Sequence, residues 1–164
     1  MKAPEMPSPS SAVQDHYPGS YAHCFGCGRL NEQGHQLKSA WEGEDVVARF
    51  TPGPEQISLP GFVYGGLVAS LMDCHGMATA AATAERSAGF AIGDRAMPRF
   101  VTASLQVRYL KPTPLGPELE LRARVREFTA KKSIVDVTIS VGGTATARGE
   151  VVAVIMPESM RANA

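Results

Sequence analysis

The sequence predicts an α+β fold in which a curved antiparallel β-sheet wraps around one long central helix. One segment, residues 64–85, is rich in Ala, Leu and Met and contains no proline, which favours a long helix. Several later segments alternate apolar and polar residues with a period of two, which is typical of strands with one buried face. Because a single helix covers only one face of such a sheet, we expect the strands to curve around it.

Two strands are expected before the helix. Residues 35–41 and 45–50 flank a turn at Gly43 and together indicate a hairpin. Residues 51–61 contain three prolines and two glycines, so they are expected to form a loop. A second loop, residues 86–98, follows the helix.

The strands after the helix have clearer patterns. Gly142-Gly143 is a hairpin signal between the last two of them. The final strand ends in a continuously apolar run, which is expected of a strand covered on both faces. The expected strands are 101–110, 119–125, 134–141 and 144–156.

Length and composition indicate one domain. The chain has 164 residues and a net formal charge of zero, so binding to nucleic acid or to an anionic membrane is not expected. Residues 1–21 are predicted to be a flexible lead-in, 22–157 the domain, and 158–164 a C-terminal tail. With no signal-peptide core and no membrane-length apolar run, a cytoplasmic location is expected.

Four stretches, in their order and spacing, resemble the PaaI-like branch of the hotdog thioesterases. They are Cys24-Phe-Gly-Cys-Gly-Arg-Leu-Asn31, Gly61-Phe-Val-Tyr-Gly-Gly66, Leu71-Met-Asp73 and Leu105-Gln-Val-Arg-Tyr-Leu-Lys-Pro112. The resemblance covers about residues 22–156. It implies a hotdog fold, assembly as a homodimer or a dimer of dimers, and hydrolysis of acyl-coenzyme A thioesters without a metal or other cofactor.

The same resemblance implies roles for residues of the helix. In that family the helix opens with His-Gly-Gly, and an acidic residue follows two turns later. Gly65, Gly66 and Asp73 match this pattern, whereas Tyr64 stands in place of the histidine. Asp73 is then the general base or the nucleophile, the Gly65 amide stabilises the oxyanion, and Tyr64 and Gly66 contact substrate.

The spacing of these residues predicts a site shared between two subunits. Backbone N–H groups at a helix start lack intrahelical partners and favour negative charge, which suits Gly65 to an oxyanion. Asp73 lies eight residues further on, or ~12 Å along the axis. Since both groups must reach the same carbonyl, we expect them to come from two antiparallel helices of a dimer.

Further candidates come from strands and loops. Thr102 stands where many relatives place a hydroxyl that binds the attacking water, and Ser58 where some relatives carry a polar side chain. Lys131 and Lys132 are expected to bind the phosphates of coenzyme A. The nearby arginines have two interpretations, a further part of this phosphate clamp or a solvated sheet face; they are Arg122, Arg124 and Arg126.

The cysteines allow other interpretations. Cys24 and Cys27 could bind zinc together with His23 or His35, but no second pair exists and Cys74 lies in the helix, so a structural turn is favoured. An odd number of cysteines also argues against a disulfide scaffold.

A local catalytic triad of Cys74, His75 and Asp73 is rejected on helix geometry. Residues one and two apart on a helix point in different directions. His75 is therefore expected to be a packing or interface residue.

Two other functions compete with thioester hydrolysis. A hotdog hydratase would show an Asp and His pair in a loop–helix motif, which the sequence lacks. A non-catalytic acyl-CoA binding or regulatory module stays open because Tyr64 replaces the family's histidine.

Overall fold

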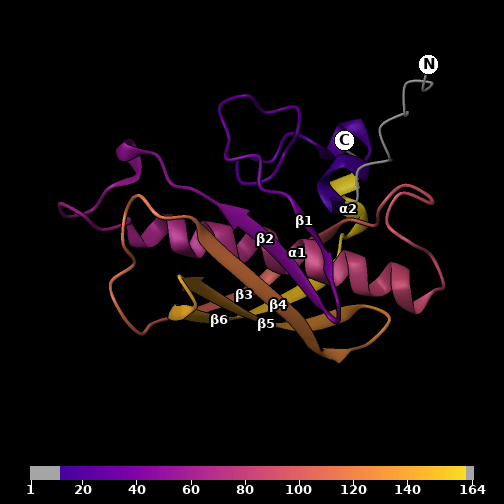
Figure 1. Ribbon diagram of the computed structural model, residues 1–164. Helices are drawn as coiled ribbons and strands as arrows, with labels where there is room; N and C mark the ends of the chain where they lie inside the picture. The colour runs from indigo at the N-terminus through magenta and orange to yellow at the C-terminus, as the bar shows by residue number, and fades with distance from the viewer. Residues whose placement is uncertain (1–11, 162–164) are drawn as a thin grey trace, which may run out of the picture.

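A computed structural model describes residues 12–161 and has the predicted architecture. A six-stranded antiparallel sheet curves around helix α1 (Gly65–Ser87), as Figure 1 shows. The strands are β1 (Ser39–Glu42), β2 (Asp45–Phe50), β3 (Phe100–Tyr109), β4 (Leu119–Phe128), β5 (Lys132–Val141) and β6 (Thr144–Ile155), in the order β1-β2-β4-β5-β6-β3. Short helical turns are η1 (Val13–His16), η2 (Gly19–Tyr21), η3 (Pro54–Gln56) and α2 (Glu158–Arg161).

Helix α1 packs closely on the sheet because small residues face it. A Cβ built on Gly76 would lie 2.8 Å from the Cβ of Val151 on β6. A Cβ built on Gly149 would lie 2.6 Å from the sulfur of Met72. Around these contacts the helix buries aliphatic side chains that are inaccessible to solvent, including Leu71 and Ala78. Glycines on both elements therefore set how closely α1 approaches β6.

Strand β3 forms an edge of the sheet. Among the described residues it pairs only with β6, and its residues after Phe100 are exposed or half-buried. Such an edge offers a row of unpaired backbone N–H and C=O groups.

The predicted first strand is wrong at its beginning, since β1 starts at Ser39 and not at residue 35. Gln36 has a φ of 53°, a left-handed conformation that a strand does not contain. The backbone N–H groups of His35 and Leu37 donate instead to the carbonyls of Phe25 and Gly26, at 2.8 and 3.1 Å. This segment thus holds the cysteine turn in place.

Within the predicted lead-in, residues 12–17 pack against the domain, and residues 1–11 lie outside the described part. Val13, Gln14 and Tyr17 are buried in the core. Gln14 donates from Nε2 to Ser39 Oγ at 3.0 Å and accepts the Ser39 N–H at 2.8 Å. This segment is packed because a buried polar side chain of β1 requires these partners.

His75 extends this buried network into α1. Its Nδ1 lies 2.9 Å from Ser39 Oγ, and its Nε2 lies 3.0 Å from the carbonyl of Val46. Since a carbonyl only accepts, Nε2 carries the proton. Burial lowers the pKa of His75 to about 4. His75 is therefore a neutral packing residue, as expected, and takes no part in a triad.

Among residues 12–161, no helix is both long and apolar enough to cross a membrane.

Candidate functional site

The predicted site residues separate into two groups at different points along α1. The first group surrounds the start of the helix. Tyr64 is the N-cap residue, and its side chain makes no capping hydrogen bond, so helix geometry leaves the N–H groups of Gly65 and Gly66 without intrahelical acceptors. The Tyr109 hydroxyl donates to the Gly65 carbonyl at 2.7 Å. The end of β3 is thereby joined to the start of α1.

The side chain of Tyr64 lies against Gly66. A Cβ built on Gly66 would lie 2.0 Å from the Tyr64 hydroxyl oxygen. The tyrosine ring therefore lies over the first turn of α1, while 55% of the residue stays exposed. The residue that replaces the family's histidine covers the glycine that the resemblance assigns to substrate binding.

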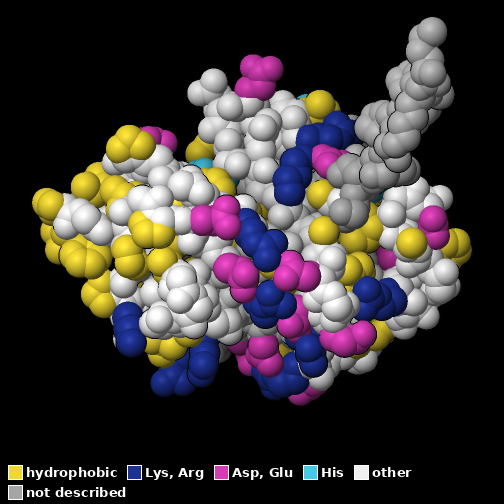
Figure 2. Space-filling view, viewed as in Figure 1, with side chains coloured by type: hydrophobic (Ala, Val, Ile, Leu, Met, Phe, Trp, Pro, Cys, Tyr) yellow, Lys and Arg dark blue, Asp and Glu magenta, His cyan; other side chains and the backbone are white. Residues whose placement is uncertain are grey.

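An apolar pocket of about 460 Å³ opens beside this helix start. Ser58 and Gly65 line it together with Val68 and Tyr109. In Figure 2 hydrophobic side chains gather at the end of the molecule where α1 begins. The exposed apolar residues of this region are Ile57, Leu59, Phe62, Tyr64, Tyr109 and Leu110. Contiguous exposed apolar surface of this kind marks an interaction or ligand site.

The second group lies further along α1, where Asp73 meets β3. The Thr102 hydroxyl donates a hydrogen bond to Asp73 Oδ1. Asp73 is half-buried, and both residues line a pocket of about 200 Å³. No pocket described for residues 12–161 is lined by both Asp73 and Gly65. The structure thus brings Asp73 together with Thr102. At the start of α1 it brings Tyr64, Gly65 and Gly66 together with Ser58. Within one chain these two groups are not joined.

Three thiols share the pocket of Asp73, an arrangement that sequence reasoning missed. Cys24, Cys27 and Cys74 have sulfur atoms within 4.8 Å of one another, whereas neither His23 nor His35 belongs to this group. Hydrogen bonds from the other two thiols lower the pKa of Cys24, and the hydrogen bond to Cys24 raises the pKa of Cys27 to about 11. Cys74, set aside because it lies in the helix, is therefore part of the cluster.

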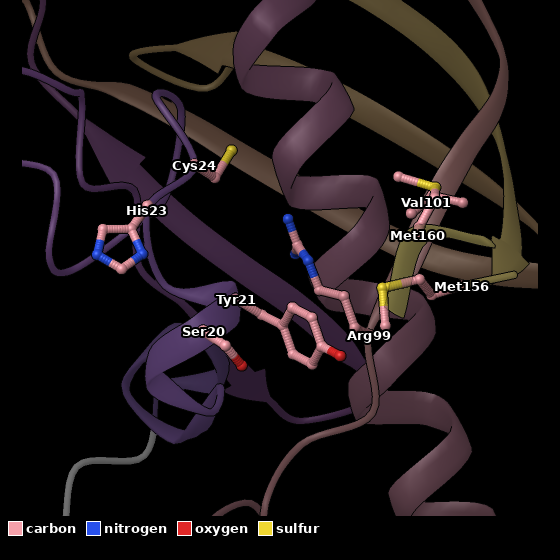
Figure 3. A pocket seen from close by; sticks show the side chains of 8 residues that line it. All are labelled: Ser20, Tyr21, His23, Cys24, Arg99, Val101, Met156 and Met160. Atoms are coloured by element: carbon pink, nitrogen blue, oxygen red, sulfur yellow. The ribbon is translucent and has the colours of Figure 1, made fainter. Parts of the chain in front are cut away.

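Arg99 is a second residue that sequence reasoning missed. It precedes β3, lines the pocket of Asp73, and also lines a neighbouring pocket of about 260 Å³. Figure 3 shows its side chain extending between Tyr21 and Cys24. Its guanidinium carbon lies 4.7 Å from the centre of the Tyr17 ring. No local pattern marks this arginine, because its neighbours come from distant segments.

The two predicted phosphate-binding lysines are exposed, Lys131 in the turn between β4 and β5 and Lys132 as the first residue of β5. Lys132 is paired with Val154 of β6, and Val154 is paired with Val101 of β3. Lys132 therefore lies two strands from Val101, roughly 10 Å. The lysine turn is at the same end of the sheet as Thr102.

The arginines Arg122, Arg124 and Arg126 are paired with acids on the outer face of the sheet. Arg122 and Arg124 contact Asp45 at 3.2 and 2.8 Å, and Arg126 contacts Asp136 at 3.1 Å. Basic and acidic side chains alternate in this region of Figure 2. These pairs favour the solvated-face interpretation of the three arginines over a phosphate clamp.

Comparisons with known proteins agree with this architecture. The family model described as "Thioesterase superfamily" matches residues 60–152, which is more than half of the chain. A crystal structure of a thioesterase superfamily protein from Shewanella loihica PV-4 is 45% identical, with a TM-score of 0.64, covering 84% of this chain and 97% of that one. No curated protein matches.

Two more distant structures share the fold. A Streptococcus mutans UA159 protein, solved bound to acetyl-CoA, is 18% identical with a TM-score of 0.58, covering 78% of this chain and 96% of that one. A Haemophilus influenzae thioesterase is 10% identical with a TM-score of 0.60, covering 74% and 79%. The antiparallel sheet around one helix is the hotdog fold, and the chain belongs to the thioesterase superfamily.

Proposed function

We propose that this protein hydrolyses acyl-CoA thioesters to a free acid and coenzyme A, with Asp73 as general base or nucleophile. The observation that carries the proposal is the hydrogen bond between Thr102 and Asp73 in a pocket beside α1. Membership of the thioesterase superfamily supports the reaction class. The acetyl-CoA bound to the Streptococcus mutans protein supports coenzyme A as the carrier.

The chemistry follows from the two groups on α1. The carboxylate of Asp73 takes a proton from water or attacks the thioester carbonyl itself. The Thr102 hydroxyl holds one carboxylate oxygen and leaves the other for the reaction. The negative charge that develops on the carbonyl oxygen is stabilised by a backbone N–H at Gly65, where the helix dipole favours an anion.

A homodimer brings these two groups together. Thr102, at the start of edge strand β3, contacts Asp73, whereas Tyr109, at its end, contacts Gly65. Antiparallel pairing of β3 with the same strand of a second subunit, centred between Leu105 and Gln106, sets Thr102 opposite Tyr109 of the partner subunit. Asp73 of one subunit then lies near Gly65 of the partner subunit. The exposed apolar surface at the helix start supports such an interface.

The remaining assignments follow this dimer. The apolar pocket with Ser58, beside Tyr64 and Gly66, receives the acyl end of the substrate. Lys131 and Lys132, exposed at the sheet end near Thr102, bind the phosphates of coenzyme A. Two such dimers associate into a dimer of dimers.

The test is hydrolysis of a panel of acyl-CoAs by the wild type and by Asp73→Asn. The substitution keeps the shape of the side chain and removes its charge. Turnover is expected to fall ~100-fold or more, since one general base contributes 10²–10⁴. KM should change far less because the acyl and coenzyme A contacts remain. Normal turnover by folded Asp73→Asn would show that this carboxylate is structural.

The same panel separates the enzyme from a non-catalytic acyl-CoA binding module. A binding module would take up acyl-CoA, measured by calorimetry, without releasing free thiol from any member of the panel. The binding module is a real alternative because Tyr64 replaces the family's histidine and covers Gly66.

A further inference from the structure

Three thiols from two distant segments meet beside Asp73, and the proposed mechanism uses none of them. Cys24 and Cys27 lie in a turn near the N-terminus, whereas Cys74 follows Asp73 directly on α1. All three sulfur atoms lie within 4.8 Å of one another, and those of Cys24 and Cys74 are 3.7 Å apart.

This spacing fits a single tetrahedral metal ion. Zinc binds cysteine sulfur at ~2.3 Å, so two thiolates on one tetrahedral zinc are ~3.8 Å apart. The separation of 3.7 Å between Cys24 and Cys74 matches that value. Cys27 is close enough to occupy a third corner with a small side-chain movement.

The turn that carries Cys24 and Cys27 is held by its backbone. The Gly28 N–H donates to the Cys24 carbonyl at 2.7 Å, and the Leu37 N–H donates to the Gly26 carbonyl at 3.1 Å. A Cβ built on Gly26 would lie 2.3 Å from the Cys74 sulfur, so the absence of a side chain at Gly26 lets the turn lie this close to α1.

The charge of such a site is also balanced. Zinc with three thiolates carries a net charge of −1, and a buried charge requires a partner. Arg99 lines the same pocket as the three cysteines. Its buried Nη1 has no hydrogen-bond partner among residues 12–161. The arginine therefore supplies the compensating positive charge.

We propose that Cys24, Cys27 and Cys74 bind one zinc ion, with Arg99 as the compensating charge and water in the fourth position. Each protonated thiol releases its proton to solvent on binding. The ion joins the cysteine turn to α1 at the residue after Asp73, and so holds that helix turn in place. This role is structural and adds to the proposed hydrolysis without taking part in it.

The test is a cobalt titration of the full-length protein, prepared metal-free under reducing, anaerobic conditions. Cobalt is expected to saturate at one equivalent, with the thiolate charge-transfer band and the visible bands of tetrahedral coordination, and zinc should displace it. An octahedral spectrum without a sulfur band, or absorbance that rises without saturating, would overturn the proposal. This measurement needs no variant.

Variants then identify the ligands. Cys24→Ser, Cys27→Ser and Cys74→Ser should each weaken binding roughly 100-fold or more. Arg99→Met should weaken it roughly 10–100-fold, as outer-shell changes do. Met77→Leu and His23→Ala are the controls: Met77 lines the same pocket, and neither residue is a proposed ligand. Both variants should bind the metal as the wild type does. Wild-type affinity in the three serine variants would contradict the assignment.

Metal binding and hydrolysis are tested separately. Asp73→Asn should still bind one equivalent of cobalt with the same thiolate band, whether or not the wild type turns over acyl-CoA. Zinc should raise the unfolding temperature of the wild type and leave that of Cys74→Ser unchanged, with circular dichroism confirming that the variant is folded. Equal zinc stabilisation of both proteins would overturn the site.

Discussion

At the scale of single residues, Asp73 and Thr102 are 29 positions apart in sequence but share a hydrogen bond. The helix supplies the acid and the neighbouring edge strand supplies the hydroxyl, so the pair exists only once α1 has packed on the sheet. In the proposed reaction Asp73 acts on the substrate, whereas Thr102 orients the carboxylate. A positioning residue of this kind should affect turnover more than substrate binding.

Thr102→Val is expected to lower kcat by about 10-fold or more, because hydrogen bonds to charged groups contribute about 1.5–3 kcal/mol. Thr102→Ser keeps the hydroxyl and should retain most of the activity. Steady-state kinetics on the best acyl-CoA measures both. Equal kcat values for the valine and serine variants would rule out a role for the hydroxyl.

His75 should make the stability of the protein depend on pH. Its pKa is about 4 in the folded state, against about 6.5 in the unfolded chain. Between these values the unfolded chain binds a proton that the folded protein does not, so the free energy of unfolding falls as pH falls. The loss across the full window is roughly 3 kcal/mol.

Urea denaturation at a series of pH values between 4 and 7 measures this dependence. His75→Gln is the matched variant, because it keeps a polar side chain and does not titrate. It is expected to be less stable at pH 7, since the bonds to Ser39 and Val46 are altered. Its stability should nevertheless fall less steeply with pH than that of the wild type. Parallel pH dependences would show that His75 does not set the slope.

At the scale of elements, the approach of α1 to β6 depends on Gly76. Gly76→Ala would gain about 1 kcal/mol on an exposed helix. Here the new methyl would lie within 3.0 Å of all three side-chain carbons of Val151. Overpacking of this kind costs about 1–3 kcal/mol. The variant is expected to be less stable by about 1 kcal/mol, measured by thermal or urea denaturation.

Val151→Gly provides the control for that prediction, because it removes all three of these carbons. In the background of this substitution the clash is relieved, so Gly76→Ala should become stabilising. An increase in stability from Gly76→Ala in the wild-type background would show that the helix has room to move away from β6.

Some of these elements could be predicted from the sequence and others could not. The helix and the later strands follow from their apolar periodicity, because each has one consistently buried face. The predicted first strand begins too early, since no local pattern reveals the left-handed Gln36 or the hydrogen bond from residue 35 to Phe25. The sequence does not predict the packing of Val13 and Tyr17, because their segment has no periodic pattern.

At the scale of the whole molecule, the sequence predicted the hotdog fold and the separation of Gly65 from Asp73 along one helix. It did not predict the cluster of Cys24, Cys27 and Cys74, because that contact joins segments 50 residues apart through tertiary packing. In a shared site each subunit contributes Asp73 to one active site and Gly65 to the other. A single subunit therefore has both halves and no complete active site.

Gly65→Pro isolates the oxyanion half-site. Proline removes the N–H and is favoured at the first position of a helix. Tyr64, with φ −61° and ψ 129°, already has the extended conformation required before proline. Gly65→Ala is the control, because it retains the N–H, and its methyl would meet the Tyr109 ring at an ordinary 3.5 Å.

The most direct measurement of the shared site is the activity of mixed dimers. Asp73→Asn and Gly65→Pro, each inactive alone, are unfolded together, refolded as an equal mixture and assayed on one acyl-CoA. Each heterodimer then has one doubly impaired site and one intact site, and half of the dimers are heterodimers. The account predicts recovery of about one quarter of wild-type turnover per subunit. Activity no higher than the mean of the two variants, with heterodimers confirmed by native mass spectrometry, would contradict it.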